Sequence, residues 1–415
     1  MKILIVNTSD ITGGAARAAY RLHKALLCSC VESNMLVLNK TSNDPSVIGP
    51  SSKIQKIIGK LRPRLDTIPV RLLYSNYSSV LFSPSWLGFS NIVNKINKIN
   101  PDVVHLHWIC GGMMTINDIA RIKAPIVWSL HDMWAFTGGF HYENTEEFHK
   151  VSKNSSLIGT KKIDNLSKKL LKRKKAVFAK KNDITIVGLS RWIAKEAKKS
   201  KIFGNKNIIN LPNPIDTDLF SPMNKFEARK LLNLPNDKKL ILFGAMSATK
   251  DRRKGWLELK SALNKVSSNN TELVVFGSDN DNYEYSLPVQ FTGTIEDDKT
   301  LKILYSACDV MVVPSLQENL SNAIMESLAC GLPVVGFDIG GNGDLIEHKI
   351  TGYLAKPFDV LDLKDGITWV LSAQNYNELC LNARKKVMKD FDSSLVAKKY
   401  LELYANILSR AHAIN

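Results

Sequence analysis

Residues 308–341 read CDVMVVPSLQENLSNAIMESLACGLPVVGFDIGG, and this stretch is the most informative part of the sequence. It contains an apolar, strand-like run at Val310–Val313, followed by a loop and by a helix that we expect to begin within 319–322 and to end at Gly331. A second apolar run, 333–336, follows directly. Short apolar runs separated by helix-sized intervals are typical of a parallel sheet that helices cover on both faces.

Two carboxylates flank the expected start of this helix. Glu318 lies in the loop at the carboxyl end of the first strand, and Glu326 lies about one turn inside the helix, where we expect it to point into the same crevice. The first N–H groups of a helix have no internal partner and its dipole is positive there, which predicts an anion site. The residues at this site are Asn319, Leu320, Ser321 and Asn322. Because carboxylates accept hydrogen bonds from vicinal hydroxyls, a nucleotide sugar is the predicted ligand.

The segment resembles the retaining glycosyltransferases of family 4. Its Glu-x7-Glu spacing is in register with the Pro-Ser that precedes Glu318, with the Ala-Cys-Gly-Leu-Pro-Val-Val run and with the pair Gly340-Gly341. The resemblance extends over nearly the whole chain. It implies an α/β protein of the GT-B fold, in which two Rossmann-like, doubly wound parallel-sheet domains face each other across a cleft. It also implies retention of anomeric configuration, a nucleoside-diphosphate sugar as donor, and no metal or other cofactor.

The other apolar runs divide between the two halves of the chain. We expect strands at 3–6, 35–38, 103–107, 126–130 and 184–188, and then at 240–243, 273–276 and 289–291. A proline-rich joint, 211–222, separates the two groups. We therefore predict an acceptor-side domain over 1–205 and a nucleotide-sugar-binding domain over 206–394. A C-terminal helix at about 395–415 is expected to pack back on the first domain.

Composition narrows the class of protein. The chain has 415 residues, of which 44% are hydrophobic and 23% charged, as in globular proteins. No apolar stretch approaches the length of a membrane-spanning helix, and the six cysteines form no Cys-x-x-Cys pair. A cytoplasmic enzyme without a metal centre is expected. Asp216-Thr217-Asp218 resembles the Asp-x-Asp of metal-dependent transferases but lies in the joint.

The net charge of +17 implies an anionic partner, which could be nucleotide phosphates, a lipid surface or nucleic acid. Nucleic acid is disfavoured because the basic residues lack interleaved aromatic residues and no recognition motif is present. The most basic segment, 161–181, carries ten Lys and Arg residues against one Asp. It is interpreted as the solvated face of a long amphipathic helix.

In the first half, the resemblance assigns roles to three residues. Gly13 and Gly14 follow the first strand and match the family's glycine loop, which allows the backbone to approach a substrate closely. An ordinary turn is the alternative for such a pair. His131 closes the fourth strand and matches the family's active-site histidine, which contacts the transferred sugar. His105 and His107 are interpreted as structural.

In the second half, a cationic run precedes a helix that we expect to open at Trp256. Lys254 with the glycine after it resembles the family's phosphate-binding Lys-Gly, and cations beside a helix start suit a pyrophosphate. The family commonly has Arg directly after the glycine of the preceding strand, where this chain has Ala245. Either Arg252 or Arg253 is expected to replace that charge.

The remaining roles also follow from the resemblance. Glu326 is expected to hold the ribose hydroxyls, and Glu318 with His131 to position the sugar. The backbone near Thr294 and Ile295 is expected to contact the nucleobase. The predicted reaction transfers a sugar to a glycan or lipid-linked glycan, in surface-polysaccharide synthesis. A nucleotide-sugar epimerase on the same fold is the rival enzyme.

Residues 53–73 carry a further expectation. Ile54, Ile57, Ile58 and Leu61 would form one apolar stripe of a helix, with Lys53, Lys56 and Lys60 around it. Such a basic amphipathic helix can lie on an anionic membrane, which would make the enzyme peripheral on the inner membrane face. The alternative is that the stripe packs on the sheet of its own domain.

Overall fold

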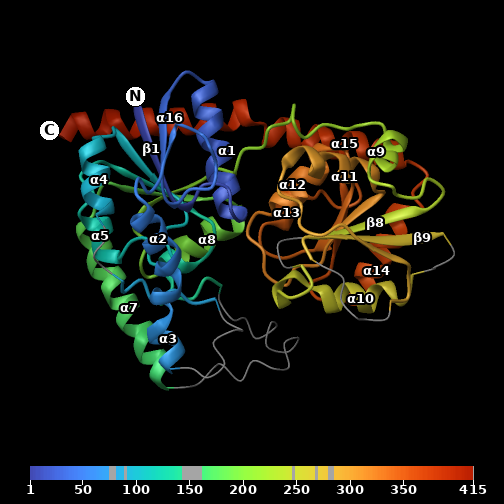
Figure 1. Ribbon diagram of the computed structural model, residues 1–415, viewed down its shortest axis with the longest axis horizontal. Coiled ribbons are helices and arrows are strands. Elements are labelled where there is room, and N and C mark those ends of the chain that lie inside the picture. Colours follow the sequence, from blue (N-terminus) through green and yellow to red (C-terminus); the bar gives the residue numbers. More distant parts are fainter. Residues whose placement is uncertain are drawn as a thin grey trace. The chain divides into compact units, whose positions relative to one another are not determined.

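The computed structural model describes residues 1–73, 81–87, 91–142, 161–244, 248–266, 270–278 and 285–414. The chain forms two compact units, each built around one sheet (Figure 1). The first comprises Met1–Pro214 with Val396–Asn415, and the second comprises Ile215–Leu395. This division falls later than the predicted boundary at 205/206, because strand β7 (Asn207–Asn210) pairs with β6 of the first sheet.

The first sheet has seven parallel strands in the order β3-β2-β1-β4-β5-β6-β7. The strand bounds are Lys2–Ser9 for β1, Glu32–Asn39 for β2, Val47–Ile48 for β3, Val103–Leu106 for β4, Ile126–Leu130 for β5 and Ile184–Gly188 for β6. Every residue of β4, β5 and β6 is buried, which is why these strands are unbroken apolar runs in the sequence. The strand order reverses between β1 and β4, and in open α/β sheets ligands bind at such a point.

Helices cover both faces of this sheet. They are α1 (Gly14–Cys28), α2 (Lys53–Asp66), α3 (Ile68–Leu73), α4 (Ile92–Ile99), α5 (Ile116–Ala120), α7 (Lys161–Lys180), α8 (Arg191–Lys199) and most of α16 (Ser393–Ile414). α7 exposes most of its described cations, as expected, but Lys174 is fully buried with its ammonium 3.9 Å from the centre of the Trp134 ring. Lys181, just after the helix, is buried as well, so the solvated-face interpretation of the segment 161–181 fails at these two lysines.

The second sheet has six parallel strands in the order β10-β9-β8-β11-β12-β13. Their bounds are Lys239–Gly244 for β8, Thr271–Phe276 for β9, Val289–Phe291 for β10, Val310–Val313 for β11, Val334–Phe337 for β12 and Gly352–Ala355 for β13. The order reverses between β8 and β11. The helices of this unit are α9 (Lys225–Leu231), α10 (Trp256–Leu263), α11 (Asp298–Ala307), α12 (Asn322–Ala329), α13 (Asn342–Leu345), α14 (Val360–Leu371) and α15 (Tyr376–Asp390).

The predicted pair of doubly wound parallel sheets is confirmed. Three strands escaped prediction, β3, β7 and β13, and each lies at the edge of its sheet. Edge strands are short and half-exposed, so they lack the apolar run that identifies a central strand. The helix expected to open within 319–322 begins at Asn322, with Ser321 as its N-cap.

Candidate functional site

In the second unit, the loop between β11 and α12 carries Glu318. The Nζ atom of Lys254 lies 3.0 Å from Oε2 of this carboxylate, and the backbone N–H of Asn319 donates to its Oε1 at 3.3 Å. The two partners of the ion pair are 26% and 12% exposed. The structure thus joins two residues that the sequence singled out separately, and both follow the carboxyl ends of neighbouring strands.

Two glycines allow this loop to adopt its position. A Cβ atom on Gly255 would lie 1.8 Å from the carbonyl oxygen of Pro314, and one on Gly340 would lie 1.8 Å from the carbonyl oxygen of Glu318. Both glycines have positive φ angles, 75° and 52°. Any side chain at either position would push the loop away, so the glycines after Lys254 and in the Gly-Gly pair are required by close backbone approach.

Three of the four cations in the run before α10 pair with carboxylates, and the fourth, Lys250, is exposed. Lys254 pairs with Glu318, and both arginines pair within their own segment. The pairs are Arg252 with Glu258 at 2.5 Å, and Arg253 with Asp251 at 2.6 Å. Three positive and three negative formal charges therefore meet here, and Lys250 adds one positive charge. The excess of positive charge is smaller than the cationic run in the sequence had suggested.

The two arginines differ in how firmly they are held. Both contact their carboxylate through two nitrogen atoms, but Glu258 is buried, so breaking the pair with Arg252 would leave a buried carboxylate without its cation. Arg253 and Asp251 are 29% and 24% exposed, so water can replace either partner. Arg253 is therefore the arginine that can exchange its carboxylate for a ligand at smaller cost.

Glu326 lies in the buried part of α12. Its Oε2 accepts a hydrogen bond of 2.8 Å from the hydroxyl of Tyr305 in α11, and the residue is 4% exposed. The sequence placed Glu326 in the same crevice as Glu318 and gave no signal for its tyrosine partner. At the helix start, Ser321 accepts from the N–H of Ile324 at 3.4 Å, and the first turn carries no acidic residue. The N-terminal end of α12 therefore keeps its positive dipole.

The residues predicted to contact the nucleobase lie at the ends of β9 and β10. The N–H of Gly277 donates to the carbonyl of Gly293 at 2.8 Å, which joins the two loops. Thr294 is exposed and Ile295 is half-buried in the loop after β10. Because β8, β9, β10 and β11 are parallel neighbours, these loops lie at the same edge of the sheet as Lys254 and Glu318.

In the first unit, Gly13 is the N-cap of α1 and has a φ angle of 97°. No side chain caps this helix, and its first turn has no acidic residue. The loop before it is fixed by Asp10, whose carboxylate accepts hydrogen bonds from the N–H groups of Thr41 and Ser42 after β2. Gly13 and Gly14 therefore form an ordered turn that presents the start of α1 at the carboxyl end of β1.

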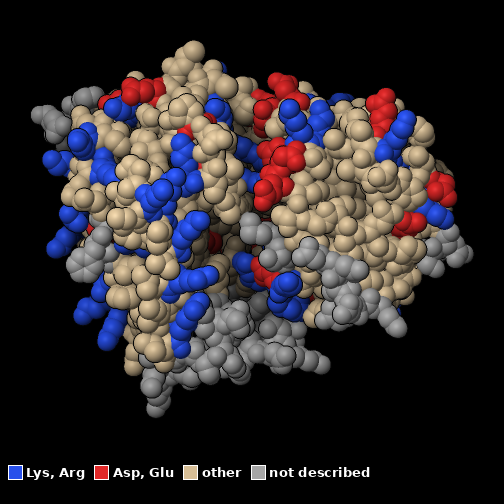
Figure 2. All heavy atoms as spheres, in the orientation of Figure 1, with Lys and Arg blue, Asp and Glu red and all other residues tan. Residues whose placement is uncertain are grey.

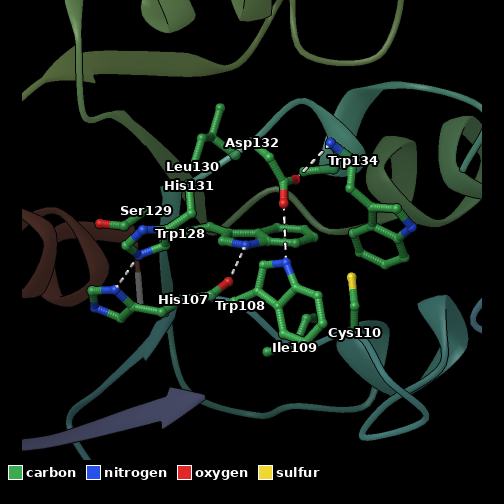
Figure 3. A pocket seen from close by; sticks show the side chains of 11 residues that line it. His107, Trp108, Ile109, Cys110, Trp128, Ser129, Leu130, His131, Asp132 and Trp134 are labelled. Carbon is green, nitrogen blue, oxygen red and sulfur yellow. Dashed lines mark hydrogen bonds between the residues drawn. The ribbon is translucent and has the colours of Figure 1, made fainter. Parts of the chain in front are cut away.

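His131 follows β5 and meets a second histidine (Figure 3). Its Nε2 lies 2.9 Å from Nδ1 of His107, and the ring of His107 lies 4.4 Å from that of His105. His105 in turn bonds the hydroxyls of Ser129 and of Tyr404 in α16. Burial lowers the pKa of His131 to about 4 although the neighbouring Asp132 opposes the shift, and burial lowers the pKa of His105 to about 3. These imidazoles are neutral at pH 7, as a hydrogen-bonding role of His131 requires.

Asp132 anchors the segment that follows His131. Its Oδ2 lies 2.6 Å from Nδ1 of His141, and Nε2 of His141 lies 2.8 Å from the hydroxyl of Ser83. The same Oδ2 of Asp132 also accepts a hydrogen bond of 3.0 Å from the indole N–H of Trp108. This connectivity is that of a hydrolase triad, but Ser83, His141 and Asp132 are all buried, and neither Ser83 nor His141 lines the cavity of Figure 3. We interpret it as a network that fixes the loop, and the sequence gave no indication of it.

Among the residues that the structure describes, no group of three or more His, Cys, Asp or Glu could hold a metal ion. Asp216, which opens the Asp-x-Asp motif, accepts hydrogen bonds from the N–H groups of Asp218 and Leu219.

In the same described part of the chain, no helix is long and apolar enough to cross a membrane.

Comparison with known proteins agrees with this geometry. Residues 224–388 match the model of glycosyl transferases group 1. An uncharacterised glycosyltransferase of Methanocaldococcus jannaschii is 28% identical over 73% of this chain and 75% of its own length. A GDP-mannose-dependent alpha-mannosyltransferase of Corynebacterium glutamicum is 23% identical over 91% of this chain and 84% of its own length.

Solved structures share the fold. Sucrose-phosphate synthase from Thermosynechococcus elongatus has a TM-score of 0.69 at 18% identity, covering 99% of this chain and 100% of that structure. Anabaena HepE, solved with UDP and glucose, has a TM-score of 0.66 at 15% identity, covering 98% of this chain and 99% of that structure. None of these similar proteins is named as an epimerase or a nucleic-acid-binding protein, so neither alternative is favoured.

Proposed function

We propose that this chain is a GT-B glycosyltransferase that transfers a hexose-type residue from a nucleoside-diphosphate sugar with retention of anomeric configuration. The proposed acceptor is a glycan or a lipid-linked glycan, and the proposed role is in surface-polysaccharide synthesis. The names of two relatives support this acceptor class, since both describe transfer to sugars on diphospho-undecaprenol. The structure of HepE with UDP-glucose supports the donor class.

The observation that carries the proposal is the contact between Lys254 and Glu318, 3.0 Å apart at adjoining strand ends. A sugar diphosphate places negative phosphate oxygens next to hydroxyl groups. Lys254 can bind the phosphate oxygens, and the neighbouring carboxylate of Glu318 can accept hydrogen bonds from the sugar hydroxyls. The start of α12, which follows Glu318 directly, adds N–H groups and a positive dipole.

We assign the diphosphate to Lys254, Arg253 and the residues before α12, namely Asn319, Leu320, Ser321 and Asn322. Arg252 stays with Glu258, because the carboxylate of that pair is buried. No divalent metal is needed in this scheme, since the charge that develops on the leaving diphosphate meets two cations and a helix dipole.

We assign the ribose hydroxyls to Glu326, whose carboxylate Tyr305 orients. The nucleobase contacts the backbone at Thr294 and Ile295, at the ends of the joined loops. Glu318 accepts hydrogen bonds from the transferred sugar, and the neutral imidazole of His131 bonds a sugar hydroxyl. Gly13 and Gly14 allow the backbone before α1 to approach the substrate.

In the proposed reaction, the bond between the anomeric carbon and the diphosphate oxygen breaks on the same face on which the acceptor oxygen bonds to that carbon. The acceptor's hydroxyl proton passes to the departing phosphate oxygen. Configuration is therefore retained without a protein nucleophile.

The test is to incubate the protein with a panel of nucleotide sugars and to measure slow hydrolysis. One donor should be consumed, with release of its nucleoside diphosphate. With an added acceptor alcohol, NMR of the glycoside formed should show the donor's anomeric configuration, because a glycoside does not mutarotate as a free sugar does. A glycoside of inverted configuration would contradict retention. Consumption without any nucleoside diphosphate, or activity that chelators abolish and Mg²⁺ restores, would contradict the diphosphate scheme.

A further inference from the structure

Helices α2 and α3 expose a continuous apolar row. Its members recur every three or four residues, so they share one side of the helical segment. They are Ile54, Ile57, Ile58, Leu61, Leu65, Ile68 and Leu72. The exposed fraction reaches 70% at Ile54 and 81% at Leu72. Scattered exposed leucines are ordinary in proteins, but seven in one row form a patch of the kind that marks an interaction surface.

The opposite side of α2 is fixed to the domain. Its buried residues are Gly59, Arg62 and Asp66. A Cβ atom on Gly59 would lie 3.0 Å from the carbonyl oxygen of Leu38 in β2, so the helix packs closely on the sheet at this point. Arg62 donates to the carbonyl of Gly112 at 2.5 Å. These contacts prevent the helix from rotating to bury the apolar row, which rules out the alternative that the row packs on its own sheet.

Cations border the row. Lys53, Lys56, Lys60, Arg64 and Arg71 are exposed, and the single acidic residue of the segment, Asp66, is buried. On the face shown in Figure 2, Lys and Arg side chains lie over the region where Figure 1 places α2 and α3, with other side chains between them. Trp86, which is 45% exposed, extends the apolar surface and donates its indole N–H to the carbonyl of Asp66 at 3.0 Å.

We propose that this docking surface, α2 and α3 with Trp86, lies in the interface of a membrane that contains anionic lipids. The apolar side chains enter the boundary between headgroups and acyl chains, while the lysine and arginine stems reach back to lipid phosphates. Tryptophan favours this depth because its ring is apolar and its N–H polar. A second copy of the chain fits less well, because a symmetric contact would bring two identical basic rows together.

The experiment is co-sedimentation of the full chain with vesicles of phosphatidylcholine, alone or mixed with phosphatidylglycerol. Binding should require phosphatidylglycerol and weaken as salt rises. Each lysine near an anionic surface strengthens binding about fivefold, so Lys53→Glu, Lys56→Glu and Lys60→Glu together should weaken it by about 100-fold or more. Ile57→Ser with Leu61→Ser should weaken binding by about 10-fold or more, because less apolar surface is buried.

The matched control is Lys195→Glu, Lys198→Glu and Lys201→Glu, which makes the same charge change at exposed positions on α8 and just beyond it. It should weaken binding by less than about fivefold. An equal loss in the control would overturn the proposal, since binding would then follow net charge alone. Unchanged binding of the Ile57 and Leu61 variant, or no binding of the folded protein to phosphatidylglycerol at low salt, would also overturn it.

Light scattering without lipid tests whether a second copy of the chain, rather than a membrane, covers the apolar row. If the protein were a dimer that Ile57→Ser with Leu61→Ser converts to a monomer, the row would be a contact between copies and the proposal would be wrong. Circular dichroism of each variant checks the fold, and all the substituted positions are exposed. Vesicle binding does not depend on sugar transfer, so failure of this inference and failure of the proposed function can be told apart.

Discussion

The candidate site of the second unit and that of the first are built in opposite ways. In the second, partly exposed charges pair with one another, as Lys254 does with Glu318. In the first, half-buried His131 contacts a row of neutral imidazoles, of which His107 and His105 are buried. A charged pair that water reaches can exchange its partner for a ligand, whereas a buried neutral network keeps its geometry. The second unit is therefore suited to bind a charged donor, and the first to position an uncharged group.

The largest expected effect is a loss of turnover when either residue assigned to the transferred sugar, Glu318 or His131, is replaced. Glu318→Gln keeps the shape of the side chain but weakens its acceptance of hydroxyl bonds, so turnover should fall by about 100- to 1,000-fold. His131→Ala should lower turnover by about 100-fold. Calorimetry should show nucleoside-diphosphate affinity within about threefold of wild type for both, because neither residue is assigned to the nucleotide.

The control for this test is Glu378→Gln, at an exposed position of α15, which should leave turnover unchanged. Full turnover in either test variant would remove that residue from the proposed chemistry. A loss of nucleotide affinity equal to the loss of turnover would move the residue from the sugar to the nucleotide.

The next effect concerns Glu326, a buried carboxylate of the proposed donor site. Glu326→Ala removes a charged acceptor, and hydrogen bonds to such groups contribute about 1.5–3 kcal/mol, so nucleoside-diphosphate affinity should fall about 10- to 100-fold. Tyr305→Phe removes only the hydroxyl that orients this carboxylate and should cost less than Glu326→Ala. Calorimetry measures both. Unchanged affinity in Glu326→Ala would contradict the ribose assignment.

The third prediction separates the two arginines. Arg253→Gln should weaken nucleoside-diphosphate binding by about 10-fold with little change in stability, because its present partner is accessible to water. Arg252→Gln should instead lower the free energy of unfolding by about 1–3 kcal/mol, since buried Glu258 loses its cation. Urea unfolding and calorimetry on both variants provide the comparison. The opposite pattern would exchange the two roles.

The two sites also differ in how far the sequence could predict them. The central strands were predicted because residues such as those of β5 are buried on both faces. Lys254 and Glu318 were recognised from contiguous motifs. These motifs contain Gly255 and Gly340, which must be glycine because the backbone of another loop lies too close for a side chain. Their contact was not predicted, because a sequence does not show which strand ends adjoin.

Fewer features of the candidate site in the first unit could be predicted from sequence motifs. Tyr404 and Ser83 become partners of His105 and His141 only through packing between distant parts of the chain, and buried hydroxyls and imidazoles have no fixed spacing in sequence. The same holds for Tyr305 beside Glu326 in the second unit. Side-chain networks that depend on tertiary contacts were therefore missed in both units, whereas motifs that constrain the backbone were found.

The smallest effect tests the neutral imidazoles. Burial lowers the pKa of His105 to about 3, below its ordinary 6.5, so the unfolded chain binds more protons than the folded one when the pH falls below about 6.5. The stability that the neutral ring contributes is present above that pH and decreases as the pH falls. Between pH 7 and pH 5.5, one such histidine should cost the folded state about 1 kcal/mol. Urea unfolding at the two pH values measures the loss, with His105→Gln as the matched variant that cannot titrate. Whatever the variant's stability at each pH, its loss of unfolding free energy between pH 7 and pH 5.5 should be smaller than that of the wild type by about 1 kcal/mol. An identical loss in the two proteins would mean that His105 is not held neutral by the fold. The contrast between the charged candidate site of the second unit and the neutral one of the first would then fail at this residue.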